Sequence, residues 1–170
     1  DSKSWGPNYV RLGMVLESNL EGASAFNLAG QINMRELNAL GAEWRTDLQL
    51  GDQTLIASEL YHPIAEGSRW FVAPRVSATT FDVDTFENGR RAASFGVDLF
   101  TLGLDLGWTL GTWGEARVGY SRIIGDVNSS FATQTIPGFE FDDGLMVAQL
   151  QFDTLDYADF PTEGVVGGIN

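Results

Sequence analysis

The segment Leu102-Gly103-Leu104-Asp105-Leu106-Gly107-Trp108 decides the fold class, because its large apolar residues recur at every second position. The positions between them hold two glycines and an aspartate. Side chains alternate between the two faces of a β-strand, so a period of two predicts a strand with one apolar face and one polar face. The segment therefore predicts a strand that separates two different environments.

The same alternation recurs on both sides of this segment. Val10-Arg11-Leu12-Gly13-Met14 shows it near the N-terminal end, and Met146-Val147-Ala148-Gln149-Leu150 shows it near the other end. Glycine, asparagine and proline between such runs are turn signals. The predicted strands are residues 10–17, 26–35, 40–50, 54–61, 69–86, 91–108, 115–124 and 145–154, and a further strand starts at Val165.

Two parts of this pattern leave alternatives open. Glu87-Asn88-Gly89 predicts a hairpin tip between residues 69–86 and 91–108, two arms of 18 residues each. The alternation slips by one at Phe100-Thr101, which is either a turn between short strands or a β-bulge inside a long one. The equal arms favour the bulge. Residues 125–143 are predicted to form the longest loop, on the extracellular side, with an extension of the flanking strands as the alternative.

Composition excludes several classes of function. The 170 residues suit one domain, and a net charge of −13 disfavours binding to nucleic acid. Cysteine is absent and His62 is the only histidine, so thiolate metal sites and a Ser-His-Asp triad are not expected. Gly22-Ala23-Ser24-Ala25-Phe26 lacks the closing glycine of a nucleophile elbow. Because Glu140, Asp142 and Asp143 also lack the ligand spacing of a calcium site, we expect no cofactor and no enzyme activity.

Charged residues stand on the polar face in the middle of the predicted strands. Both signs are mixed there, and nine of the ten cations are arginine, as suits ion pairs in the lumen of a membrane barrel. The opposite face is rich in Leu, Val, Phe, Met and Ala, with Trp and Tyr toward the strand ends, which is typical of a lipid-facing band. The candidate lumen-facing binding residues are Arg35, Glu43, Arg45, Asp47, Glu59, Arg75, Asp98, Asp105 and Arg117.

The alternative is a soluble β-sandwich or a soluble ligand-binding β-barrel, in which the leucine-rich face would be the interior. Two expectations separate it from the membrane interpretation. The apolar face should be exposed once the membrane is removed, at Leu12, Leu28, Trp44, Leu104 and Leu150. At least one arginine–carboxylate contact should join neighbouring strands among Arg35, Glu43, Arg45, Asp47 and Glu59, as a structural ion pair rather than a transport filter.

Several short segments, taken in order, resemble a known family. They include Trp5-Gly6-Pro7-Asn8-Tyr9, Leu37-Asn38-Ala39-Leu40-Gly41, Glu59-Leu60-Tyr61-His62-Pro63, Phe152-Asp153-Thr154-Leu155-Asp156 and Phe160-Pro161-Thr162-Glu163-Gly164. Together they resemble the C-terminal barrel of patatin-like phospholipases (type Vd autotransporters), in the bacterial surface antigen superfamily, over essentially the whole chain. The resemblance implies a patatin domain, a POTRA domain and a 16-stranded outer-membrane barrel. The chain departs from the family in lacking Gly-x-Ser-x-Gly, and hence the patatin dyad, and the Val-Arg-Gly-Tyr motif.

These observations predict an all-β fold, an antiparallel transmembrane β-barrel with about eight strands here, as the N-terminal half of a 16-stranded barrel. We expect residues 1–170 to form an incomplete barrel domain, because Gly13, Gly41, Gly103 and Gly107 among the charges suit a lumen wider than that of a closed eight-stranded ring. A self-contained or dimeric eight-stranded barrel is the alternative.

The expected role is a non-catalytic anchor and translocator in the bacterial outer membrane. By resemblance, the expected partners are outer-membrane lipids and the barrel assembly machinery. The C-terminal strands of the same chain, or a second copy, would complete the barrel. The remainder of the same chain would also supply the POTRA domain and the patatin domain.

Overall fold

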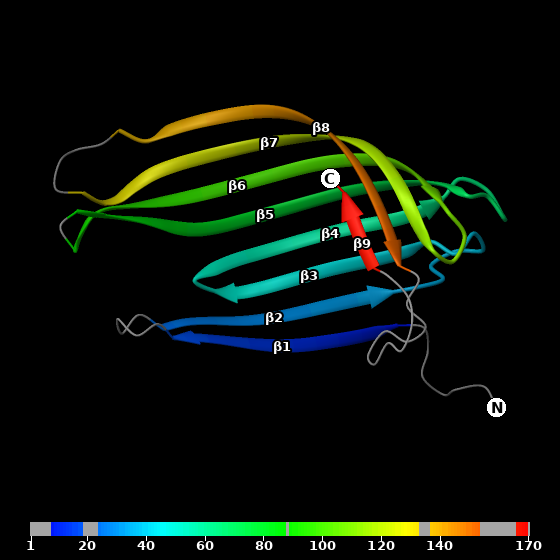
Figure 1. Cartoon of the computed structure of the whole chain (residues 1–170), viewed down its shortest axis with the longest axis horizontal. Helices are drawn as coiled ribbons and strands as arrows, with labels where there is room; N and C mark the ends of the chain where they lie inside the picture. Colours follow the sequence, from blue (N-terminus) through cyan, green and yellow to red (C-terminus); the bar gives the residue numbers. More distant parts are fainter. Residues whose placement is uncertain (1–7, 19–23, 88, 133–136, 154–165, 170) are drawn as a thin grey trace.

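The computed structural model describes residues 8–18, 24–87, 89–132, 137–153 and 166–169, and it shows a single antiparallel β-sheet (Figure 1). Nine strands lie in chain order, each hydrogen-bonded to the next. The predicted all-β antiparallel fold is confirmed. The described residues include no helix long and apolar enough to cross a membrane. The strands are β1 (Tyr9–Ser18), β2 (Ser24–Met34), β3 (Glu43–Gly51), β4 (Gln53–Pro63), β5 (Trp70–Glu87), β6 (Arg90–Thr109), β7 (Gly114–Ala132), β8 (Phe139–Asp153) and β9 (Val166–Ile169).

The prediction of a long loop over residues 125–143 is wrong, and the alternative of an extension of the flanking strands is confirmed for β7 and β8. β7 continues to Ala132, and β8 begins at Phe139. The ladder between them includes Asp126 opposite Glu140. Aspartate, asparagine and glycine have low β-propensity, but here β7 is paired on both sides, so its neighbours supply the hydrogen bonds of a regular strand. Residues 133–136 of the predicted loop lie outside the described part of the chain.

The slip in the apolar pattern at Phe100-Thr101 is neither a turn nor a β-bulge. β5 pairs with β6 without a break over residues 70–85 of β5, and the predicted long hairpin is confirmed. The register shifts lie nearer the tip of the hairpin. In the β5–β6 ladder the shift follows Thr85, and in the β6–β7 ladder it follows Ser94. The alternation of side chains between faces therefore continues through Phe100, and what changes there is which face is apolar.

The sheet is open in the described part of the chain. β1 pairs with β2, and β8 pairs with β9 through Leu150–Asp153, but no ladder joins β1 to β8. The eight strands do not close into a lone ring, in agreement with the prediction. The outer edge of β1 therefore presents backbone N–H and C=O groups without a strand partner among the described residues.

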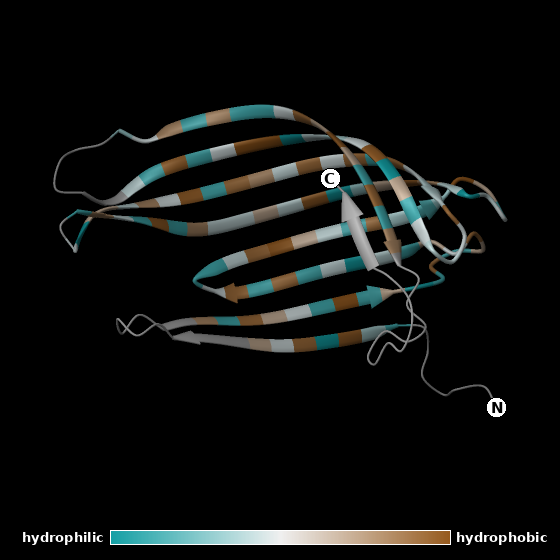
Figure 2. Cartoon of the chain, viewed as in Figure 1, coloured by the Kyte–Doolittle hydropathy of each residue, from teal (hydrophilic) through white to brown (hydrophobic). Residues whose placement is uncertain are grey.

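The sheet is curved, and its two faces differ in polarity. Glu59 on β4 and Arg117 on β7 are 3.0 Å apart although β5 and β6 lie between them, so their face is concave. The other, convex face carries most of the large apolar side chains, and the alternation of the two kinds along each strand is visible in Figure 2. The five apolar residues predicted to be exposed are exposed: Leu12 80%, Leu28 42%, Trp44 43%, Leu104 58% and Leu150 40%.

Candidate functional site

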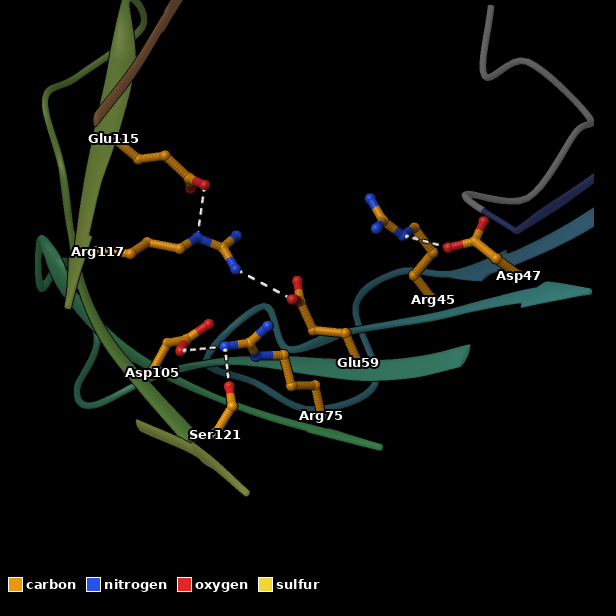
Figure 3. A network of polar contacts seen from close by, with 8 residues as sticks. All are labelled: Arg45, Asp47, Glu59, Arg75, Asp105, Glu115, Arg117 and Ser121. Atoms are coloured by element: carbon orange, nitrogen blue, oxygen red, sulfur yellow. Dashed lines mark hydrogen bonds and ion pairs between the residues drawn. The ribbon is translucent and has the colours of Figure 1, made fainter. Parts of the chain in front are cut away.

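Arg117 on β7 lies at the centre of a network of polar contacts on the concave face (Figure 3). Its guanidinium donates hydrogen bonds to Glu59 on β4 over 3.0 Å and to Glu115 on its own strand over 2.6 Å. The Phe71 ring of β5 lies 5.1 Å from the same guanidinium and is fully buried. The ring has room because Gly107 stands opposite it on β6, and a Cβ at Gly107 would overlap the ring. A charged group, a flat ring and a glycine thus stack in one place.

Arg75 on β5 forms a second group of contacts beside the first. It donates to Asp105 on β6 over 3.1 Å and to Ser121 on β7 over 2.8 Å, and the Asp105 side chain is only 6% exposed. Gly103 and Gly119 make these contacts possible, because a Cβ at Gly103 would overlap Arg75 and one at Gly119 would overlap Asp105. The Nε of Arg75 is buried and has no hydrogen-bond partner among the described residues.

The structure corrects the interpretation of the glycines as signs of a wide lumen. Gly103 and Gly107 are covered by the side chains of their cross-strand partners, an arrangement known to fix strand register. Gly41 lies outside the strands, in the turn before β3, with φ of 77°. Gly13 has open space where a side chain would be, as does Gly41 in its turn. Gly103 and Gly107 therefore allow side chains to pack over the sheet rather than widening its interior.

Two further ion pairs extend the network toward β2 and β3. Arg35, which directly follows β2, contacts Glu43 at the start of β3 over 3.4 Å. Arg45 contacts Asp47 on its own strand over 3.0 Å. The predicted arginine–carboxylate contact between neighbouring strands is confirmed by the first pair. Whether these charges act only as structural ion pairs stays a prediction.

A polar hollow of about 460 Å³ lies between these groups on the concave face. Asn33, which is 7% exposed, donates to the Tyr9 hydroxyl over 3.0 Å, and its Oδ1 has no partner among the described residues. One buried acceptor beside the hollow is therefore unsatisfied by the described residues. The charges of the hollow balance, because three arginines face three glutamates: Arg35, Arg45, Arg117, Glu43, Glu59 and Glu115.

Asp98 is separate from the other predicted site residues. Because the register of β6 is unbroken between them, Asp98 and Asp105 face opposite sides of the sheet, and Asp98 lies on the convex face. It accepts a hydrogen bond of 2.6 Å from Thr80 Oγ1 on β5. The prediction that Asp98 lines the lumen is wrong, because the expected bulge at Phe100-Thr101 would have exchanged the two faces.

Sequence reasoning missed three participants in the network, namely Glu115, Ser121 and Phe71. Glu115 and Ser121 lie two and four residues from Arg117, so the period of two on β7 was the signal that could have found them. Phe71 takes part because it stands opposite Gly107. That pairing depends on the strand register, which the alternation alone does not determine.

The exposed apolar residues of the convex face form a belt that crosses the strands obliquely. The row of paired residues through Trp44 on β3 passes Leu104 on β6 and reaches Met146 on β8. Here the direction from Trp44 to Leu50 along β3 is called up. On β3 the belt lies above this row, from Trp44 to Leu50. On β8 it lies below this row, from Met146 to Leu150. Relative to the Trp44–Met146 row, the upper limit of the belt lies six residues up on β3, four residues up at Ile56, Phe100 and Ile124 on β4, β6 and β7, and at the row itself on β8.

This drift determines how the strands incline to the belt. With a rise of ~3.3 Å per residue and a strand spacing of ~4.8 Å, the overall shift of six residues over the five steps from β3 to β8 corresponds to a mean tilt of about 40°. On β6 the belt runs from Trp108 to Phe100, or about 26 Å along the strand and about 20 Å perpendicular to the belt at this tilt. Trp108 packs against Trp70 at one limit, with ring centroids 4.8 Å apart.

The remaining chemistry of the described residues is limited. No group of three or more His, Asp or Glu side chains in the described ranges could hold a metal ion. No protein-family model, curated protein or solved structure matches the chain. The polar concave face and the apolar convex face of the sheet are therefore the features that bear on function.

Proposed function

We propose that this chain is part of an antiparallel transmembrane β-barrel of the bacterial outer membrane, where it serves as an anchor with a polar lumen. The oblique apolar belt is the observation that carries the proposal. For a belt that lies level in a bilayer, the end-to-end shift from β3 to β8 requires a mean strand tilt of about 40°, and the strands of membrane barrels tilt by roughly 35–45°. The belt height of about 20 Å is close to the roughly 25 Å apolar band of outer-membrane barrels.

The distribution of polarity also supports a membrane barrel over a soluble one. Convex residues such as Leu104 and Met146 are 58% and 70% exposed, whereas Asp105 on the concave face is 4% exposed and paired with Arg75. A soluble barrel buries its apolar residues inside and exposes its charges. A continuous exposed apolar surface instead marks contact with a membrane or a partner.

The segments that resemble the barrel of patatin-like autotransporters suggest which protein this barrel serves. On that proposal, the chain anchors the protein and contributes to translocation, and lipid hydrolysis belongs to a patatin domain elsewhere in the same protein. The barrel assembly machinery would insert the strands. The concave ion pairs, which span β2 to β7, would hold the lumen wall in shape.

The open edge of β1 sets a further requirement in a bilayer. Each backbone group left unpaired in the hydrocarbon region costs several kcal/mol, so membrane barrels are closed. On the proposed function, the edge is covered by further strands of a 16-stranded barrel or, as the alternative, by a second copy. Paired β-strands are required in either case.

Site-directed spin labelling tests the proposed function, and the absence of native cysteine makes single labels straightforward. Leu102→Cys and Thr101→Cys place labels on adjacent residues of β6, one on each face. In lipid nanodiscs, the Leu102→Cys label should be accessible to oxygen and protected from a water-soluble nickel complex. The Thr101→Cys label should show the reverse. Equal accessibility of both labels to the nickel complex would contradict the proposal.

A further inference from the structure

Toward the tip of the β5–β6 hairpin the polarity of the two faces inverts. The convex face becomes acidic, with Asp98 opposite Asp126 and Asp126 opposite Glu140. The concave face becomes apolar in the same rows. The concave residues in these rows and in the next concave row of β5 toward the tip are here named the distal apolar patch: Leu55, Phe81, Val83, Val97, Leu99, Val127 and Phe141.

A cationic group stands at the start of this patch. A hollow of about 210 Å³ on the concave face is lined by Arg45, Arg75, Ser77 and Thr101, together with Asp47 and Glu59. The two acids already have arginine partners. Arg45 is 52% exposed and contacts Asp47 through Nε, and its terminal nitrogens point away from Asp47 (Figure 3). These terminal N–H groups have no partner within the described ranges and can donate to an anion.

The patch offers apolar contact without hydrogen-bonding groups. Each of β5, β6 and β7 is paired on both sides, so the backbone beneath the patch has no free donors or acceptors for a ligand. An extended peptide lying on it would leave the N–H and C=O groups turned toward the patch unsatisfied, whereas a hydrocarbon chain has no such groups. The chemistry of the patch therefore favours an acyl chain.

We propose that the concave face binds a long-chain fatty acid, with its carboxylate at Arg45 and its acyl chain along the distal apolar patch. Ser77 to Val83 on β5 spans six residues, or about 20 Å, which suits an extended long acyl chain. Opposite charge places the carboxylate at Arg45, and burial of the chain against Phe81, Val97 and Leu99 supplies the apolar contact. The inference rests on the proposed function, because a lumen would give the ligand access to this face.

Photo-crosslinking in lipid nanodiscs tests the inference. The probe is palmitic acid carrying a diazirine in its chain, and the labelled peptides are located by mass spectrometry. We expect saturable labelling of the concave residues of β5 and β6, suppressed by excess palmitate. Val97→Asn should lower it about five-fold, as expected for the loss of one apolar contact. Asp98→Asn changes the adjacent convex residue of the same strand and should leave it unchanged.

The head group is tested separately. Arg45→Gln should lower labelling by the free acid but not by its methyl ester, and Arg69→Gln, in the exposed turn before β5, is the matched control. Val83→Asn, at an exposed position near the tip, provides a second patch variant should Val97→Asn fail to fold. Labelling confined to the convex belt, or insensitive to both patch variants, would overturn the inference.

Failure of the inference is distinguishable from failure of the proposed function. Labels confined to the convex belt would remain compatible with a lipid-facing barrel. Failure of the proposed function would instead appear as equal accessibility of the Thr101→Cys and Leu102→Cys spin labels. Equal effects of Arg45→Gln on the free acid and on the ester would overturn the assignment of the carboxylate to Arg45.

Discussion

Replacing Gly107 by alanine should destabilise the chain although only one methyl group is added. The new Cβ would overlap the ring of Phe71, which is fully buried and lies 5.1 Å from the Arg117 guanidinium. The ring cannot stay in place, so the change overpacks the site and displaces the support of Arg117, at a cost of about 1–3 kcal/mol. Gly13→Ala is the matched control, because no atom lies within 4 Å of its Cβ position. The control should be neutral or more stable by up to about 1 kcal/mol, since glycine weakens strands.

The assay is denaturant unfolding in detergent micelles, followed by tryptophan fluorescence. We expect Gly107→Ala to be less stable than Gly13→Ala by about 2 kcal/mol. A double-mutant cycle with Phe71→Ala isolates the cause, because without the ring the added methyl group has space and Gly107→Ala should cost little. Equal stability of the two alanine variants, or an undiminished cost of Gly107→Ala in the Phe71→Ala background, would refute the steric argument.

Three further predictions follow from the two faces and the hairpin tip. Leu104→Arg should cost roughly 2–4 kcal/mol in a bilayer, because Leu104 lies inside the convex belt; folding into liposomes measures it, and a cost near zero would count against lipid contact. Arg117→Met should cost about 2–3 kcal/mol in the unfolding assay, because it leaves Glu59 and Glu115 without their shared partner, and adding Glu59→Gln should recover part of the loss. Hydrogen bonds from Ser94 and then Arg91 lower the pKa of Asp84, so its contribution to stability is present above its unfolded pKa of about 3.9 and is lost as the pH falls through the folded value. Asp84→Asn should therefore flatten the acid side of the stability curve, and an unchanged curve would contradict this.

The alternation of side chains was sufficient to predict the order of the strands and most of the concave charges, but not the full lengths of β7 and β8. A period of two assigns residues to faces wherever the backbone is regular, and it placed Arg45, Arg75, Asp105 and Arg117 together. It failed at Phe100-Thr101, where a change in chemistry along a regular strand looks the same in the sequence as a shift in its backbone. Asp98 was misplaced for that reason.

The contacts within the network could not be predicted from the sequence to the same degree. The Glu59–Arg117 pair joins strands that are not neighbours, so it depends on the curvature of the sheet. Phe71 supports Arg117 because the register places it opposite Gly107, and a shift by one residue would move the ring to the other face. The same dependence explains why glycines that suggested an open lumen are covered by side chains.

The inversion of polarity along β6 gives the slip in the pattern a physical cause. In one uniform medium the same face would stay apolar over the whole strand, yet Leu102 is on the convex face and Leu99 is on the concave face. On the proposed function, the convex face meets lipid up to Phe100 and water beyond it, where Asp98 follows. The concave apolar residues then lie in the part of the barrel that projects from the bilayer, where the acidic convex face meets water. On the proposed function, a change of the apolar face along a regular strand, as at Phe100-Thr101, therefore marks where a long strand leaves the membrane and continues beyond it.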